Sequence, residues 1–305
     1  MTRTQAWTGW PLRRILKRLC LSKSRYHAWA QRAARDTLAD LVRPPQSPWQ
    51  ALPAEVDAVL TYALTHPRDG YRRLAWMMVD EDVAYLSPSS VYRILDNADL
   101  LSRRKRSKRA GTPPPEPTAP HQRWHTDLMY LRVADQWYFL VTVLDASSRY
   151  VVHWDLLTTM TAAAVRVVVQ DAVKLTGASP AVVTDNGSQF TAQDFQDLVR
   201  ECDLEHIRIR TYHPESKGKV ARFHRSTRDA LEDLDLRNLG RAREVIGGWV
   251  RHYNEERLHA ALHYLPPNEY YTGDPPARLA ERHRKLVAAR ERRYVANRAR
   301  LEAAA

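Results

Sequence analysis

A proline-rich segment, Gly111-Thr-Pro-Pro-Pro-Glu-Pro-Thr-Ala-Pro120, divides the 305-residue chain into two parts with different sequence patterns. Consecutive prolines favour an extended polyproline conformation without internal hydrogen bonds, so this segment acts as a stiff spacer between domains. Before the segment, apolar residues recur at helical spacing. After it, β-type runs alternate with helical stretches, which predicts an α/β domain.

Charge is unevenly distributed between these parts. Residues 1–120 carry 20 Lys and Arg against 11 Asp and Glu, residues 121–275 carry 18 against 21, and residues 276–305 carry 9 against 3. Basic ends around a near-neutral centre favour a polyanionic partner such as DNA. The two ends would bind this partner, and the centre would be a catalytic or scaffolding core. A uniformly basic chain would have been more typical of general RNA association.

Cysteine content and hydropathy exclude several classes of protein. Only Cys20 and Cys202 are present, far apart in the sequence, which argues against a disulfide framework and a cysteine-rich zinc site. No apolar run approaches the roughly 18 residues of a membrane span, and the N-terminus lacks the apolar core of a signal peptide. We therefore expect a cytoplasmic protein that does not bind a membrane.

The region before the proline-rich segment is predicted to contain two helical groups. Helices are expected at 11–19 and at 22–30, the latter capped by Ser22 or Ser24. A second group is expected at 55–64, 71–80 and 91–96, with Ser89 or Ser90 as the cap of the last helix. A short helix after a turn can enter the major groove of DNA, although a packing module without DNA contact has the same pattern.

A run of basic residues follows the second group. Phosphate contacts supply most non-specific affinity for DNA, so this run favours DNA binding over a purely solvated linker. Its members are Arg103, Arg104, Lys105, Arg106, Lys108 and Arg109.

Strands are predicted at 123–133, 137–145, 150–157, 181–184 and 207–212, and helices at 162–175, at 192–201 and from Gly218 onwards. This order predicts one mixed sheet with helices on its faces. Asp127 and Asp185 each end a β-type run, and Asp185-Asn-Gly-Ser forces a tight turn. Either aspartate taken alone is most simply a turn or cap residue, but together they suggest a divalent metal site.

Four motifs together resemble the integrase core of bacterial insertion-sequence transposases, of the type encoded by a second reading frame. The motifs are Thr126-Asp127 with Tyr130, Thr184-Asp-Asn-Gly-Ser-Gln-Phe190, the segment His213-Pro to Arg225, and Tyr253-Asn-Glu-Glu-Arg-Leu-His-Ala-Ala-Leu262 followed by Pro266-Pro267. Upstream, Leu21-Ser-Lys-Ser-Arg-Tyr-His-Ala-Trp29 and Gly70-Tyr-Arg-Arg-Leu74 are similar to the helix-turn-helix segments that precede this core.

The resemblance implies an RNase H-like α/β core of the DDE superfamily, preceded by all-α helix-turn-helix domains and followed by a basic helical tail. The expected parts are a helix-turn-helix-like segment at 1–45, a second helix-turn-helix-like DNA-binding domain at 50–102, a basic and proline-rich linker at 103–120, the integrase core at 121–273, and the tail at 274–305.

The same resemblance implies a catalytic triad of Asp127, Asp185 and a glutamate immediately before Arg222-Phe-His-Arg225. That position is Ala221. An intact triad would hold two Mg²⁺ or Mn²⁺ ions, with Asp127 and Asp185 as metal ligands. Glu215 lies six residues away and is a poor substitute for a ligand that must be placed to a fraction of an ångström. The chain thus corresponds to a Glu-to-Ala variant, with weakened metal binding and disabled catalysis.

The implied function is binding of terminal inverted repeats, followed in an active enzyme by metal-dependent DNA cleavage and strand transfer. The implied partners are double-stranded DNA, both element ends and target, further copies of the chain, and the product of an upstream reading frame. The expected location is the bacterial cytoplasm, in association with the nucleoid. A transposase-derived repressor without catalytic activity and an RNase H-like junction nuclease are the alternatives.

The helix from Gly218 is expected to pack on the sheet through apolar residues at helical spacing: Val220, Phe223, Ala230, Leu231 and Leu234. Basic residues at its start and on its flank are candidates for DNA contact: Lys217, Lys219, Arg222, Arg225 and Arg228. Arg225 and Arg228 continue the flank of Ala221, where a surface salt-bridge row with Glu232 is the alternative. His213 and His224 are expected to be structural.

The tail carries an apolar stripe with a spacing of seven residues, namely Ala280, Val287, Tyr294 and Leu301. This stripe is expected to dock on the core or on another subunit.

Overall fold

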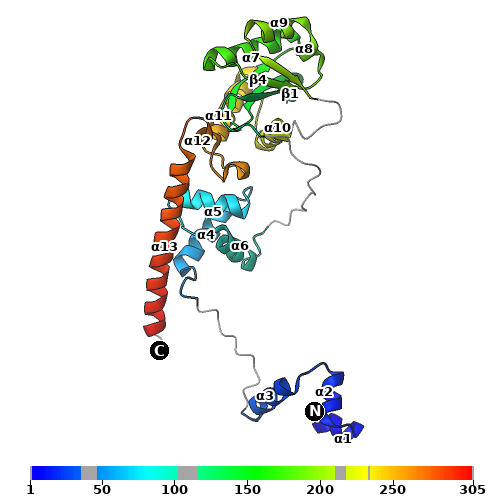
Figure 1. Ribbon diagram of the computed structural model, residues 1–305, viewed down its shortest axis with the longest axis vertical. Helices are drawn as coiled ribbons and strands as arrows, with labels where there is room; N and C mark the ends of the chain where they lie inside the picture. Colours follow the sequence, from blue (N-terminus) through cyan, green and yellow to red (C-terminus); the bar gives the residue numbers. More distant parts are fainter. Residues whose placement is uncertain (1, 36–46, 102–115, 210–217, 233, 304–305) are drawn as a thin grey trace. The chain divides into compact units, whose positions relative to one another are not determined.

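The computed structural model describes residues 2–35, 47–101, 116–209, 218–232 and 234–303 (Figure 1). The chain forms two compact units, residues 1–50 and residues 51–305. The basic run from Arg103 to Arg109 and Lys217 lie outside the described residues. None of the described helices is long and apolar enough to cross a membrane.

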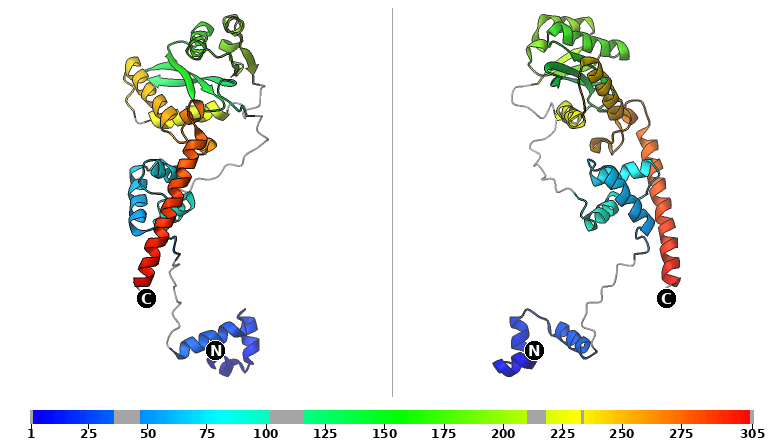
Figure 2. Two further views of the ribbon diagram at one scale, coloured as in Figure 1. Left: turned by 60° about the vertical axis from the view of Figure 1, so that its left-hand side comes forward. Right: turned by 180° about the vertical axis from the view of Figure 1, so that it is seen from behind.

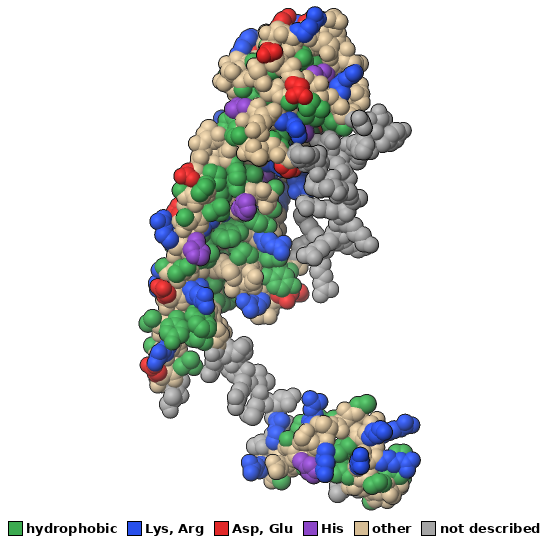
Figure 3. Space-filling view, in the orientation of Figure 1, with side chains coloured by type: hydrophobic (Ala, Val, Ile, Leu, Met, Phe, Trp, Pro, Cys, Tyr) green, Lys and Arg blue, Asp and Glu red, His purple; other side chains and the backbone are tan. Residues whose placement is uncertain are grey.

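The first unit contains three short helices, α1 (Thr2–Thr8), α2 (Leu12–Arg18) and α3 (Lys23–Ala34). The Ser22 hydroxyl accepts a hydrogen bond from the Arg25 amide at 3.2 Å, which confirms the predicted cap of the second expected helix. Ile15 and Leu16 are buried. The unit exposes many basic side chains (Figure 3), namely Arg13, Arg14, Lys17, Arg18, Lys23, Arg25 and Arg35.

The second unit begins with a helical domain, residues 51–101, built from α4 (Pro53–Thr65), α5 (Tyr71–Asp80) and α6 (Pro88–Asn97). Its core contains Val59, Leu74, Met78, Val91 and Leu95. The cap of α6 is Ser87, whose hydroxyl accepts from the Ser90 amide at 3.3 Å. The prediction of Ser89 or Ser90 is wrong, because Pro88 is pre-organised for the first helical position and starts the helix earlier.

The remainder of this unit is built around a five-stranded mixed sheet. The strands are β1 (Arg123–Val133), β2 (Gln136–Asp145), β3 (Val151–Leu157), β4 (Ala181–Thr184) and β5 (Glu205–Arg208), in the order β3-β2-β1-β4-β5. Strands β1, β2 and β3 are antiparallel neighbours, whereas β4 and β5 run parallel to β1. The predicted mixed sheet is confirmed. The last strand begins two residues earlier than predicted, and residues 210–212 lie outside the described residues.

Helices cover both faces of the sheet (Figure 2). On one face, α7 (Ala162–Thr176), α8 (Ser188–Thr191) and α9 (Gln193–Glu201) share a core with Trp124 and Val182. On the other face, α10 (Gly218–Leu231) and α11 (Leu239–Glu255) share a second core with Met129 and Val133. The short 3₁₀ turn Ala260–Leu262, α12 (Pro267–Tyr271) and α13 (Pro275–Ala303) end the chain.

The seven-residue stripe predicted for the tail lies on the exposed side of α13. Val287, Tyr294 and Leu301 are 41%, 36% and 37% exposed. The buried residues of α13 are instead Arg282, Ala289 and Arg293, and both arginines contact the helical domain. Docking of the stripe on the core is therefore wrong, because α13 turns a different side, with the bonded guanidinium groups of Arg282 and Arg293, toward the rest of this unit.

A buried asparagine ties α11 to the edge of the sheet. The Asn254 side chain accepts from the Val151 amide at 2.9 Å and donates to the Val151 carbonyl at 3.1 Å. Asn254 is 5% exposed and Val151 is 2% exposed, so water does not replace these bonds. The amide of Asn254 thus acts like a short neighbouring strand beside β3.

We predict that Asn254→Ala destabilises the integrase core by about 1–3 kcal/mol for each backbone group left unpaired on β3. Urea unfolding followed by tryptophan fluorescence measures the change. His252→Ala on the same helix is the control, because His252 is exposed and surface substitutions cost at most about 0.5 kcal/mol. Equal unfolding midpoints for the two variants would contradict the role assigned to Asn254.

Candidate active site

The pairing of β1 with β4 aligns Asp127 with Asp185. The parallel register matches Arg123 with Ala181 and His125 with Val183. Continued by two residues, the same register brings Asp127 level with Asp185, and neighbouring strands lie about 4.8 Å apart. Asp127 lies within β1 and not at its end, which corrects the sequence prediction. The reason is that β1 continues along β2 to Val133 after β4 has ended at Thr184.

Side-chain alternation assigns both aspartates to the α10 face of the sheet. Trp124 and Leu128 belong to the core beneath α7 and α9, whereas Met129 belongs to the core beneath α10. Because successive residues of a strand alternate between faces, Asp127 takes the α10 face with Met129. Val182 belongs to the α7 side, so the same alternation assigns Asp185 to the α10 side.

Hydrogen bonds order the turn that follows β4. The Gly187 amide donates to Asp185 Oδ1 at 2.9 Å, which fixes one oxygen of that carboxylate. The Asn186 side chain donates to the Ile209 carbonyl at 3.0 Å, as expected for a residue that orders the loop. Thr184 Oγ1 lies 2.9 Å from His206 Nε2. The turn is thereby fastened to β5.

Helix α10 packs on the sheet much as its apolar pattern predicts. Val220, Phe223 and Leu231 are buried. Leu234 is 48% exposed, because α10 ends at Leu231 and the helical spacing no longer applies beyond it. Thr227 is also buried, and its hydroxyl accepts from the Trp249 indole at 3.0 Å. Helix α10 is therefore held by α11 as well as by the sheet.

Helix α10 also brings His224 close to Asp127. His224 is 4% exposed, and its Nδ1 lies 3.7 Å from Asp127 Oδ2. The sequence suggested only a structural role for this histidine. Its position one helical turn after Ala221 could have indicated that His224 lies near the aspartates, because residues three apart on a helix are neighbours. Ala221 is exposed. It lies one helical turn before His224, the residue that contacts Asp127.

A buried neutral histidine lies on the same face of β1 as Asp127. His125 is 5% exposed. Burial, reinforced by the charges of Lys219 and Arg123, lowers the pKa of His125 to about 3. His125 therefore carries no charge at neutral pH and does not neutralise the carboxylates.

Lys219 fastens the beginning of α10 and is not presented to solvent. Its Nζ donates to the Ala146 carbonyl at 3.0 Å and forms an ion pair with Glu116, which Arg149 also contacts at 3.5 Å. The side chain is 17% exposed, and burial lowers its pKa although the bond to Glu116 acts in the opposite direction. The DNA contact predicted for Lys219 stays a prediction, and in this structure its charge is paired with Glu116.

Arg222, Arg225 and Arg228 are exposed on α10. Arg225 and Arg228 follow Ala221 by four and seven residues and share its flank. The motif from Tyr253 to Leu262 contacts α10 at two places. The Tyr253 ring lies 4.8 Å from the Phe223 ring, and the Arg257 side chain donates to the Ser226 hydroxyl at 3.3 Å. Sequence reasoning used this motif for the resemblance and assigned it no such contact.

The donor set at this site fits one divalent cation better than two. Two carboxylates on adjacent strands can hold a hard cation whose coordination is completed by water or phosphate oxygens. Within the described part of the chain, no group of three or more His, Cys, Asp and Glu side chains converges as a metal site. Position 221, where the resemblance places the third carboxylate of a two-ion centre, is alanine.

Comparisons with known proteins agree with this architecture. Two family models described as Integrase core domain match residues 117–214 and 202–267. An uncharacterized 39.2 kDa protein of insertion element IS476 from Xanthomonas euvesicatoria is 30% identical over 229 residues, covering 72% of this chain and 64% of that protein. Transposase InsD for insertion element IS2A/D/F/H/I/K from Escherichia coli is 29% identical over 222 residues, covering 67% of this chain and 73% of that protein. The chain thus spans less than two thirds of the IS476 protein.

A solved structure of the HTLV-2 integrase catalytic core domain in complex with magnesium aligns at a TM-score of 0.43 and 18% identity, covering 50% of this chain and 97% of that chain. A likeness of this strength adds nothing to the assignment, which depends on the sequence matches and the topology of the sheet. The chain therefore contains an integrase core domain built on the five-stranded mixed sheet, and it is similar in sequence to the transposases of bacterial insertion sequences.

Proposed function

We propose that this chain is the DNA-binding transposase of an insertion sequence, and that alanine at position 221 disables its strand-cleavage step. One observation carries the proposal. Asp127 and Asp185 are level on adjacent strands, and the position one turn before the histidine that contacts Asp127 has no carboxylate. In this proposal the two aspartates are two of the three acids of a metal-dependent nuclease centre.

Asp127 and Asp185 are the residues that would hold Mg²⁺ or Mn²⁺. When bound, such an ion supplies Lewis acidity at a phosphoryl oxygen and lowers the pKa of a bound water. The protein contributes orientation: the Gly187 amide fixes one oxygen of Asp185, and His224 Nδ1 lies 3.7 Å from Asp127 Oδ2. A glutamate at position 221 would complete the ligands for a second ion.

The reaction that a complete centre supports is an in-line displacement at phosphorus. Water or a DNA 3′-hydroxyl forms the new P–O bond, and the bond to the leaving 3′-oxygen breaks. A covalent intermediate with the protein is not required, so no nucleophilic serine or tyrosine is assigned. Arg225 and Arg228 continue from position 221 along α10 and are suited to contact the phosphates beside the reacting bond.

The DNA partners in this proposal are the terminal inverted repeats of the element and a double-stranded target. The segment 1–45, the helical domain assigned to 50–102 and the basic linker 103–120 bind DNA, and the core assigned to 121–273 acts on it. Exposed Lys and Arg on α2 and α3 support a phosphate-binding role for the first unit. Further copies of the chain and an upstream-frame product are proposed partners in the assembled complex.

Alanine at position 221 also favours a second candidate function, a transposase-derived protein that occupies element ends without cutting them. Such a protein needs the DNA-binding parts and not the metal centre. Specific end binding that Ala221→Glu leaves without cleavage would support this second function.

We predict that Ala221→Glu restores Mg²⁺-dependent cleavage of element-end DNA to at least about 100-fold above the parent chain, because it supplies the missing ligand. Cleavage of a labelled end duplex in Mg²⁺ or Mn²⁺ measures the effect. Ala221→Gln is the matched control, since it adds a similar side chain without the negative charge. Asp185→Asn combined with Ala221→Glu should remain inactive. An Ala221→Glu chain that binds end DNA but never cuts it would overturn the catalytic assignment.

We predict that Arg225→Glu and Arg228→Glu each weaken binding to end DNA and reduce the salt slope of the affinity by about 1, because each removes a phosphate contact. Fluorescence anisotropy over a range of salt concentrations measures both quantities. Arg200→Glu is the control with the same charge change, since Arg200 is 69% exposed on α9 on the opposite face of the sheet. If all three variants bind alike, Arg225 and Arg228 belong to a surface row without DNA contact.

A further inference from the structure

A buried arginine of the C-terminal helix joins three segments that are far apart in the sequence. Arg282 is 3% exposed, and its Nε and Nη2 donate to the two oxygens of Asp80 at 2.7 and 2.5 Å. Its Nη2 and Nη1 also donate to the carbonyls of Tyr264 and His263 at 2.7 and 3.3 Å. The guanidinium group thus connects α13 to the end of α5 and to the turn before α12.

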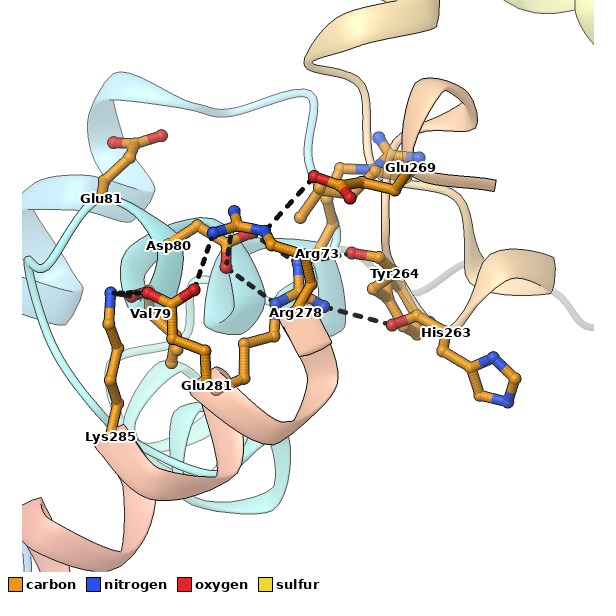
Figure 4. Close-up of polar contacts among 12 residues, drawn as sticks. Arg73, Val79, Asp80, Glu81, His263, Tyr264, Glu269, Arg278, Glu281 and Lys285 are labelled. Carbon is orange, nitrogen blue, oxygen red and sulfur yellow. Dashed lines mark hydrogen bonds and ion pairs between the residues drawn. The ribbon is translucent and has the colours of Figure 1, made fainter. Parts of the chain in front are cut away.

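That turn has an unusual backbone conformation. His263 and Tyr264 both have positive φ, 51° and 59°, in the left-handed region that side chains other than glycine rarely adopt. The two consecutive carbonyls of His263 and Tyr264, which Figure 4 labels, thereby both accept hydrogen bonds from Arg282. The turn directly follows the motif from Tyr253 to Leu262, which supports α10. A strained conformation of this kind persists only where its surroundings hold it.

Further polar contacts attach the helical domain along α13. Arg293, 7% exposed, donates to Glu55 at 2.8 Å and to the Tyr85 carbonyl at 3.0 Å. Arg278 lies between Asp80 and Glu269 of α12, at 4.0 and 3.4 Å (Figure 4). Bonds of this kind are directional and need fixed partners, whereas apolar contacts tolerate sliding. They specify one orientation of α13 on the helical domain.

The helical domain also contacts the integrase core directly. Arg73 of α5 donates to the Leu258 carbonyl at 3.1 Å and pairs with Asp69 at 2.5 Å. Leu258 lies in the same motif whose Arg257 contacts Ser226 of α10. The helical domain, the motif and the helix that carries position 221 are therefore linked by an unbroken series of contacts.

Helix α6 takes no part in the attachments described above. Its exposed side chains are Ser89, Tyr92, Arg93, Asp96 and Asn97. Within the helical domain, the residues that bond to α13 come from α4, from α5 and from the segment between α5 and α6. A polar helix face thus stays available for DNA while the rest of its domain is held by α13.

We propose that Arg282 is a positioning residue that sets a single spacing between the DNA sequence contacted by α6 and the phosphodiester presented to Asp127 and Asp185. By joining Asp80 to the carbonyls of residues 263 and 264, it fixes the helical domain relative to the integrase core. The spacing role depends on the proposed DNA transposase function, whereas the positioning of the two parts can be measured without DNA.

The first experiment measures the distance between the two parts in the full-length chain by double electron–electron resonance. Spin labels replace Leu64 on α4 and Leu175 on α7, which are 66% and 69% exposed, after Cys20→Ser and Cys202→Ser. The parent should give one narrow distance distribution. Arg282→Met with Asp80→Asn breaks the connection without leaving a buried unpaired charge, and should broaden the distribution at least twofold.

Lys285→Met is the matched control. Lys285 lies one turn beyond Arg282 and pairs with Asp82 at 2.5 Å, but the carboxylate of that pair is 59% exposed. Exposed pairs contribute little, so the distribution should stay narrow. Unchanged circular dichroism shows that each variant is folded. Equal widths for the parent and the Arg282→Met with Asp80→Asn chain would overturn the positioning role.

The second experiment tests the spacing in the Ala221→Glu background. Five or ten base pairs are inserted into end DNA between the sequence protected by the helical domain and the cleavage site. Five base pairs turn the protected sequence to the opposite side of the duplex, because one helical turn is about 10.5 base pairs. With the five-base-pair insertion, cleavage by the Ala221→Glu chain that keeps Arg282 and Asp80 should fall at least tenfold. The variant with Arg282→Met and Asp80→Asn should lose less than threefold.

Identical spacing dependence in both chains would overturn the spacing role, even if the distance measurement supports the connection. If the Ala221→Glu chain neither binds nor cuts end DNA, the proposed function fails and the spacing role fails with it. The distance distributions would still decide whether Arg282 holds the two parts together.

Discussion

The parallel register of β1 and β4 is the constraint on which the site depends. It brings Asp127 and Asp185 level on neighbouring strands and turns both toward the face covered by α10. A slip of one residue would move every side chain of one strand to the opposite face and would separate the two carboxylates. Trp124 and Val182, both fully buried on the opposite face, fix the register, because a slip would expose them to the wrong core.

Helix α10 completes the site, and its placement depends on several independent contacts. Lys219 fastens its beginning to Glu116 and Ala146, His224 meets Asp127, and Thr227 accepts a hydrogen bond from Trp249. Each contact involves a buried or half-buried side chain, so the helix can neither rotate nor slide without leaving polar groups unpaired. Position 221 is therefore fixed even though alanine itself contributes no contact with a metal.

The attachment of the helical domain follows a different physical logic. The sheet and its helices are held by apolar cores, whereas α13 reaches the helical domain through Arg282 and Arg293, both buried and both hydrogen-bonded. A pattern of apolar residues in the sequence cannot indicate a contact surface that is formed by hydrogen-bonded arginines. The stripe of Val287, Tyr294 and Leu301 was conspicuous in the sequence for its spacing and is exposed, whereas Arg282 and Arg293 of the same helix are buried.

The sequence by itself determined the five strands in their order along the chain, the mixed sheet and the resemblance to the integrase core, because alternation, helical spacing and motif residues are local properties of the chain. The tertiary structure decided which side chains meet. It placed Asp127 within a strand, brought His224 against it, withdrew Lys219 from solvent to Glu116, and buried Arg282 between Asp80 and a strained turn. These pairings join residues up to 202 positions apart, and no local pattern specifies them, because they depend on how separately formed elements pack together.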